Sequence, residues 1–186
     1  MIDFYNRQSK LNFTYEGEAY SVTVRNVVVC PQCYSAIAAR LGNMKGDYLV
    51  VDIGSKTTDV VYVQDGFPVE SKSITIEKAT VKWMKEIQHD MKIQAGKEIP
   101  ENEIMKIVLQ EDSNLPKAYA ELIRGMLRER VQSLELELAE RGYDLDYVNI
   151  IYVGGGALVA RDYAGKYRGH VSYDCNLCAT TEIIWL

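Results

Sequence analysis

One stretch of sequence decides the fold: Val50-Val51-Asp52-Ile53-Gly54-Ser55-Lys56-Thr57-Thr58-Asp59-Val60. The apolar run Tyr48-Leu49-Val50-Val51 predicts a buried strand that ends at the carboxylate of Asp52. A glycine and small hydroxyl side chains follow, and a second strand begins at Val60. Glycine lets backbone N–H groups approach phosphate oxygens closely, and Ser and Thr hydroxyls add hydrogen-bond donors. The stretch therefore predicts a phosphate-binding turn between two strands.

The carboxylate of Asp52 suits such a site, because it can hold a metal ion through a bound water or orient an attacking water. The turn is not a P-loop, since neither G-x-x-x-x-G-K-[ST] nor G-x-G-x-x-G occurs in the sequence. The alternative is an ordinary hairpin whose Asp and Thr side chains satisfy the hydrogen bonds of the turn. In particular, Asp59 could serve only to tie down the turn. This stretch alone leaves both interpretations open.

A second glycine-rich turn follows another apolar run, Ile150-Ile151-Tyr152-Val153, and consists of Gly154-Gly155-Gly156-Ala157. Three glycines after a buried strand permit positive φ angles and a close approach of the backbone to a flat ligand. A strand-to-helix turn that needs glycine for steric reasons alone is the alternative. The two turns stand 102 residues apart, counted from Asp52 to Gly154.

The rest of the chain predicts an α/β layered domain with a mixed β-sheet flanked by helices. Helical spacing of apolar residues and helix breakers separate the expected helices from the expected strands. The acidic run Glu129–Glu140 is expected to be a solvated helix face. We expect strands at 11–15, 20–24, 48–51, 60–63, 69–77, 148–153 and 170–173, and helices at 34–41, from 79, from 100 and at 117–141.

Composition narrows the class of protein. Among 186 residues, 47% are hydrophobic and 25% charged, which is typical of a soluble globular protein and excludes a disordered or disulfide-scaffold chain. The net charge of −5 argues against direct nucleic acid binding, because a general polyanion binder is basic. No apolar run reaches the ~18 residues of a membrane helix, and the polar N-terminus lacks a signal-peptide pattern. We therefore expect a cytoplasmic protein without membrane contact.

Taken together, the two turns resemble the second phosphate loop and the adenosine loop of the actin/Hsp70/sugar-kinase superfamily, whose domains have a ribonuclease H-like fold. Within it, the sequence is most similar to the bacterial actin-like ATPases of the ParM/StbA plasmid segregation type. A third match is Val29-Cys30-Pro31-Gln32, in which Gln32 precedes Asp52 by 20 residues. The resemblance implies the fold of an actin-like ATPase domain.

The resemblance also implies a role for each matching residue. Gln32 would position the hydrolytic water, and Asp52 would act catalytically on that water or on Mg²⁺ through its hydration shell. The cofactors would be ATP, or GTP, and Mg²⁺. The phosphates would contact Gly54, Ser55, Lys56, Thr57 and Thr58, and the adenosine would contact Gly154, Gly155, Gly156 and Ala157.

By the same resemblance, residues 1–45 would be the tail of a first actin-like half, and residues 46–186 the second half. Effective hydrolysis needs both halves to enclose the γ-phosphate, so this chain alone is expected to hydrolyse ATP poorly or not at all. The complete protein would form filaments and use a DNA-binding adaptor protein as its partner. The alternatives are a chaperone- or sugar-kinase-type member of the superfamily, or a non-catalytic binding or assembly module.

The four cysteines form two C-x-x-C pairs, Cys30/Cys33 and Cys175/Cys178. Two such pairs can hold a zinc ion, and one pair can be redox-active. The separation between the pairs is far longer than is usual in zinc sites. We therefore expect four reduced thiols, with zinc or redox chemistry as the alternative.

Overall fold

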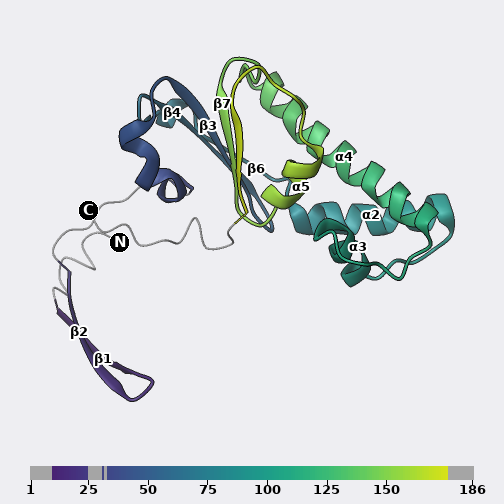
Figure 1. The fold of residues 1–186 in the computed structure, drawn as a ribbon, viewed down its shortest axis with the longest axis horizontal. Helices are drawn as coiled ribbons and strands as arrows, with labels where there is room; N and C mark the ends of the chain where they lie inside the picture. Colours follow the sequence, from purple (N-terminus) through teal and green to yellow (C-terminus); the bar gives the residue numbers. More distant parts are fainter. Residues whose placement is uncertain (1–9, 25–30, 32, 176–186) are drawn as a thin grey trace. The chain divides into compact units, whose positions relative to one another are not determined.

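The computed structural model describes residues 10–24, 31 and 33–175. The chain divides into two units, residues 1–31 and residues 32–186, and each is considered by itself. Figure 1 shows the first unit as a two-stranded hairpin and the second as a sheet with helices. None of the helices in the described ranges is long and apolar enough to span a membrane.

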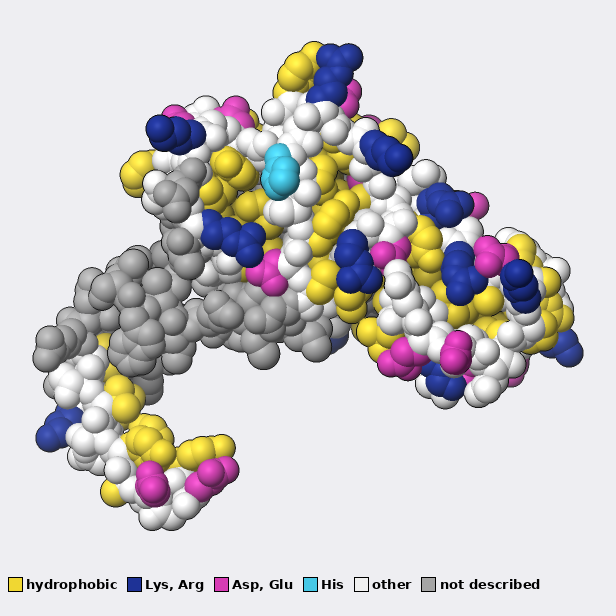
Figure 2. Space-filling view, viewed as in Figure 1, with side chains coloured by type: hydrophobic (Ala, Val, Ile, Leu, Met, Phe, Trp, Pro, Cys, Tyr) yellow, Lys and Arg dark blue, Asp and Glu magenta, His cyan; other side chains and the backbone are white. Residues whose placement is uncertain are grey.

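The first unit contains the hairpin of β1 (Lys10–Tyr15) and β2 (Glu18–Thr23). Glu16 and Gly17 join the strands, both with positive φ, as a tight turn matched to strand twist requires. The register pairs Phe13 with Tyr20, and their rings stack at 5.5 Å between centroids. Both rings remain more than 40% exposed, and Figure 2 shows hydrophobic side chains along this hairpin. A two-stranded hairpin with an open apolar face has little stability of its own.

The second unit is built on a six-stranded sheet. The strands are β3 (Asp47–Ile53), β4 (Thr58–Gln64), β5 (Phe67–Pro68), β6 (Ile74–Ile76), β7 (Asn149–Val153) and β8 (Val171–Asp174). Their order is β5-β4-β3-β7-β8, and β6 also pairs with β4. The β3–β4 pair is antiparallel, whereas β3–β7 and β7–β8 are parallel. The sheet is therefore mixed, which confirms the predicted α/β class.

Helices cover the two faces of this sheet unequally (Figure 1). The 3₁₀ helix η1 (Tyr34–Asn43) packs on one face, where Ile37 and Cys33 meet Val50 and Val61. The other face carries α2 (Thr80–Ala95), α3 (Glu101–Val108), α4 (Lys117–Glu140) and α5 (Ala157–Tyr163). Leu49, Val51 and Ile53 of β3 point into that larger core. Since side chains alternate along a strand, Asp52 lies on the η1 face.

Two predictions about local structure were wrong. The expected strand 69–77 is interrupted by the 3₁₀ helix η2 (Glu70–Lys72), because the N–H of Lys72 and the hydroxyl of Ser73 donate to the carbonyl of Val69 in place of the ladder. Glu135, expected on a solvated face, is only 5% exposed, because it meets polar groups beneath the sheet. Val29 and Cys30, which precede Gln32 in the third match to the actin-like ATPases, lie outside the described residues.

Candidate nucleotide site

The two glycine-containing turns meet at one edge of the sheet. Parallel strands end at the same edge, and the register places Asp52 beside Val153. The backbone N–H of Gly156 donates a hydrogen bond to the carbonyl of Ile53 at 2.9 Å. A Cβ at position 156 would lie 2.2 Å from Ile53 Cγ2, so only glycine permits this approach. The fold thus brings together two segments that the sequence places 102 residues apart.

The first turn is closed by its own backbone and by the start of α2. The N–H of Gly54 donates to the carbonyl of Thr57 at 3.0 Å. Thr80 donates to the carbonyl of Gly54 through its hydroxyl at 3.0 Å and its N–H at 3.3 Å, and Val81 N–H donates to the carbonyl of Ser55 at 3.0 Å. Ser55 and Lys56 are exposed at the tip. Thr80 was not singled out from the sequence, although a threonine at a helix start is a typical partner for a preceding turn.

The two threonine hydroxyls of the turn already have partners within the chain. Thr58 is fully buried, and its hydroxyl donates to the carbonyl of Lys78 at 2.6 Å. The carboxylate of Asp59 accepts hydrogen bonds from Thr57 at 3.3 Å and from Thr75 at 2.6 Å. Asp59 therefore does tie down the turn. The parts that face outward are the exposed residues Ser55 and Lys56.

Asp52 is different, because the residue as a whole is only 5% exposed, although its carboxylate oxygens still reach solvent. Among the residues that the structure describes, none donates a hydrogen bond to it. Burial, and then the negative charge of Asp59 opposite it on β4, raise the pKa of Asp52 above its ordinary value. A carboxylate that is partly removed from water and lacks a donor is costly unless a ligand completes it. Carboxylate oxygens are the donors that Mg²⁺ accepts, directly or through water, so a hydrated divalent cation fits this position.

The second turn reaches Asp52 directly. Gly154 has φ +79°, and a Cβ there would lie 2.3 Å from Asp52 Oδ1. Gly155 is half-buried, and Ala157 is fully buried as the first residue of α5. The steric interpretation of these glycines is therefore correct for Gly154 and Gly156. It does not exclude a ligand on the outer side of the turn, because close packing on β3 also fixes the position of that backbone.

The remaining residues singled out from the sequence lie away from the two turns or lie outside the described residues. Gln32, Cys30 and Cys178 lie outside the described residues. Cys33 is buried beside β4, with Sγ 3.9 Å from the carbonyl oxygen of Asp59, and burial raises the pKa of its thiol. Cys33 and Cys175 are free thiols. Within the described ranges, His, Cys, Asp and Glu side chains form no group of three or more that could hold a metal ion.

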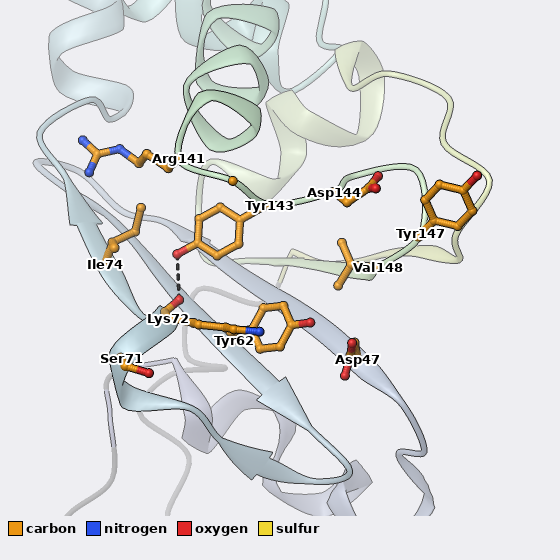
Figure 3. Close-up of a pocket in the computed structure, with 11 residues that line it drawn as sticks. Asp47, Tyr62, Ser71, Lys72, Ile74, Arg141, Tyr143, Asp144, Tyr147 and Val148 are labelled. Atoms are coloured by element: carbon orange, nitrogen blue, oxygen red, sulfur yellow. Dashed lines mark hydrogen bonds between the residues drawn. The ribbon is translucent and has the colours of Figure 1, made fainter.

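A pocket of about 520 Å³ lies at the other end of the sheet, next to Asp47 at the start of β3 (Figure 3). The rings of Tyr62 and Tyr143 stack at 6.4 Å, and the hydroxyl of Tyr143 donates to the carbonyl of Lys72 at 2.7 Å. The Lys72 ammonium lies 4.4 Å from the centre of the Tyr62 ring. Since these polar groups already have partners, the pocket does not indicate a particular ligand.

The region that contains both glycine turns matches a family of known proteins. Residues 50–163 match the family model for the C-terminal region of MreB-like archaeal actin homologues. The chain belongs to this MreB-like family. The match begins in β3 and ends with α5, so it contains both glycine turns. The fold is accordingly the actin-like one, as the resemblance implied.

Solved structures of actin homologues have the same fold. The archaeal actin homologue Ta0583 in complex with ADP is 20% identical with a TM-score of 0.60, and the match covers 87% of this chain and 56% of Ta0583. Bacillus thuringiensis ParM with ATP is 16% identical with a TM-score of 0.58, over 90% of this chain and 56% of ParM. Apo pSK41 ParM is 19% identical with a TM-score of 0.65, over 89% of this chain and 50% of that ParM. The chain thus spans about half the length of these structures. No curated protein sequence matches it.

Proposed function

We propose that this chain is the nucleotide-binding half of an actin-like ATPase. The observation that carries the proposal is Asp52, a residue only 5% exposed, whose carboxylate has no hydrogen-bond donor among the described residues and lies where the two glycine turns meet. Such a group needs a cation, a bound water or both. Solved structures of similar fold contain ADP or ATP, which supports a nucleotide as the ligand.

In this proposal the two turns divide the nucleotide between them. Gly54, Ser55, Lys56 and the backbone of Thr57 and Thr58 face the β- and γ-phosphates, and Asp52 holds Mg²⁺ through water or orients the attacking water together with Gln32. The turn formed by Gly154, Gly155, Gly156 and Ala157 packs on the adenosine. ATP is the proposed nucleotide, with GTP as the alternative. Mg²⁺ would supply charge neutralisation of the phosphates when bound.

We propose that residues 1–45 belong to a first actin-like half and residues 46–186 to the second. The open apolar face of the β1–β2 hairpin supports this, since it needs a covering layer. One half contributes one phosphate turn, whereas in-line attack on a γ-phosphate requires groups around all of its oxygens. The chain by itself therefore binds nucleotide but hydrolyses it slowly.

The complete protein would assemble into filaments, by analogy with actin homologues of the same fold. Similarity to two ParM structures supports the plasmid segregation type, with a DNA-binding adaptor protein as its partner. The net charge of −5 favours an adaptor over direct contact with DNA. Light scattering of the complete protein with ATP tests assembly: no nucleotide-dependent polymer would leave the chaperone, sugar-kinase or binding-module alternative.

Calorimetric titration of this chain with ATP in the presence of Mg²⁺ tests the proposal most directly. We expect binding that requires Mg²⁺ and that is lost in Asp52→Ala. Glu103→Gln serves as the matched control, because it changes another carboxylate of low exposure on α3, outside both turns. Equal binding by Asp52→Ala and the unaltered chain would contradict the proposed site.

A further inference from the structure

One buried carboxylate on α4 holds both ends of the segment that contains the second glycine turn. Oε1 of Glu135 accepts hydrogen bonds from the hydroxyl of Tyr152 at 3.0 Å and from the N–H of Gly165 at 3.0 Å, and Oε2 accepts from Gly165 at 3.1 Å. Tyr152 lies in β7 two residues before Gly154, and Gly165 follows the end of α5 by two residues. The strand that enters the turn and the loop that leaves α5 therefore share one anchor.

The side chains and backbone around Glu135 are closely packed. The ring of Tyr152 stacks on that of Tyr173 in β8, with centroids 5.5 Å apart and planes 7° apart. A Cβ at Gly165 would lie 2.7 Å from the hydroxyl oxygen of Tyr167. Burial, and then the charge of Glu135, raise the pKa of both Tyr152 and Tyr167. Both phenols thus stay protonated and can act as donors toward the carboxylate.

Packing alone does not require a carboxylate at this position. Neighbouring positions on the same side of α4, such as Val131 and Leu138, are filled by aliphatic side chains. Removing a carboxylate from water costs free energy that an apolar side chain of similar volume avoids. What an apolar side chain cannot do is accept hydrogen bonds from two segments, here from the hydroxyl of Tyr152 and from the N–H of Gly165 that both oxygens share, and so fix the backbone between them.

We propose that Glu135 is a positioning residue for the turn Gly154–Ala157, which it holds in register against Ile53 and Asp52. The proposal rests on the proposed nucleotide site, in which this turn contacts the adenosine. Glu135 does not itself touch the nucleotide. It acts through Tyr152 and Gly165, and its loss would loosen the adenosine contact while leaving the phosphate turn unchanged.

Amide hydrogen exchange tests the positioning independently of any ligand. The informative amides are those of Gly156 and Ala157, which donate to Ile53 and Gly154 within the turn. In Glu135→Gln, their exchange should accelerate by about tenfold, the scale of one lost hydrogen bond to a charged group. Tyr152→Phe, which keeps the ring and removes only the hydroxyl, should give a smaller acceleration. The control Glu129→Gln, at an exposed position of the same helix, should leave these amides unchanged, and unchanged exchange in both Glu135→Gln and Tyr152→Phe would overturn the proposal.

Ligand binding then tests whether Glu135 affects the adenosine turn without affecting the phosphate turn. Glu135→Gln should weaken ATP binding by about tenfold and leave the binding of inorganic tripolyphosphate, which has no adenosine, as in the unaltered chain. Equal weakening for both ligands would mean a general structural role and would overturn the positioning proposal. If the unaltered chain bound neither ligand, the proposed nucleotide site would be wrong, and the exchange measurement would still decide whether Glu135 holds the turn.

Discussion

Asp52 and Gly154 approach so closely that Oδ1 of Asp52 lies 2.3 Å from where a Cβ at position 154 would stand. The contact joins the end of β3 to the end of β7. It explains why the chain has glycine after β7 and why Asp52 as a residue is only 5% exposed. A carboxylate confined in this way costs folding free energy, which is typical of a position kept for function.

Substitution of Gly156 by alanine should separate the two turns. The new Cβ would lie 2.2 Å from Ile53 Cγ2 and 2.9 Å from the Ile53 carbonyl oxygen. We expect a loss of about 1–3 kcal/mol in the free energy of unfolding, the usual cost of overpacking, together with loss of ATP binding. Gly125→Ala is the matched control, because a Cβ there meets nothing within 4 Å. As an interior position of α4 it should gain roughly 0.5–1 kcal/mol. Chemical denaturation measures both, and a neutral Gly156→Ala would contradict the described packing.

Asp52→Asn should make the protein more stable at neutral pH. The pKa of Asp52 is raised in the folded protein, so the stability associated with its protonated form is lost as the pH rises through that raised pKa. Asparagine carries no charge and avoids this loss. Melting temperatures should therefore be higher for Asp52→Asn at pH 7, and the two proteins should converge as the pH falls below about 4, the ordinary pKa of an aspartate. A variant that melts below the unaltered chain at pH 7 would show that the carboxylate is stabilised in a way this structure lacks.

Glu103→Gln should have the opposite pH dependence. The hydrogen bond from Lys106, and then that from the N–H of Asn114, lower the pKa of Glu103 to about 2, and Ser113 also donates. Its ionised form therefore stabilises the fold above the ordinary glutamate pKa of about 4.3, and this stabilisation is lost as the pH falls toward 2. Glu103→Gln should unfold at lower denaturant concentration than the unaltered chain at pH 7. A difference that persisted at pH 2 would point to lost packing instead of lost charge.

Tyr143→Phe tests whether the pocket at the far end of the sheet is independent of the proposed nucleotide site. The variant loses the hydrogen bond to the Lys72 carbonyl and keeps the ring stacked on Tyr62. We expect a decrease of about 1 kcal/mol in the free energy of unfolding and unchanged affinity for ATP with Mg²⁺. Denaturation and calorimetry on the same sample measure the two quantities. A changed ATP affinity would show that the pocket and the turns are coupled.

Local pattern in the sequence was enough to predict the turn after Asp52, the α/β class and the order of most strands and helices. These features depend on residues close together in the chain: an apolar run, a glycine, a hydroxyl cluster and a helical stripe. The strand predicted at 69–77 was wrong because local hydrogen bonds to the carbonyl of Val69, made by the 3₁₀ turn, replace the ladder there.

The sequence by itself determined where the two glycine turns lie and that the domain is layered. Only the tertiary structure decided what each polar side chain does. Thr58 turns its hydroxyl to Lys78, Glu135 is buried under β7, and Asp52 meets Gly154. Each of these depends on strand register and helix packing between distant residues, because a one-residue change of register would turn every side chain of a strand to the other face of the sheet.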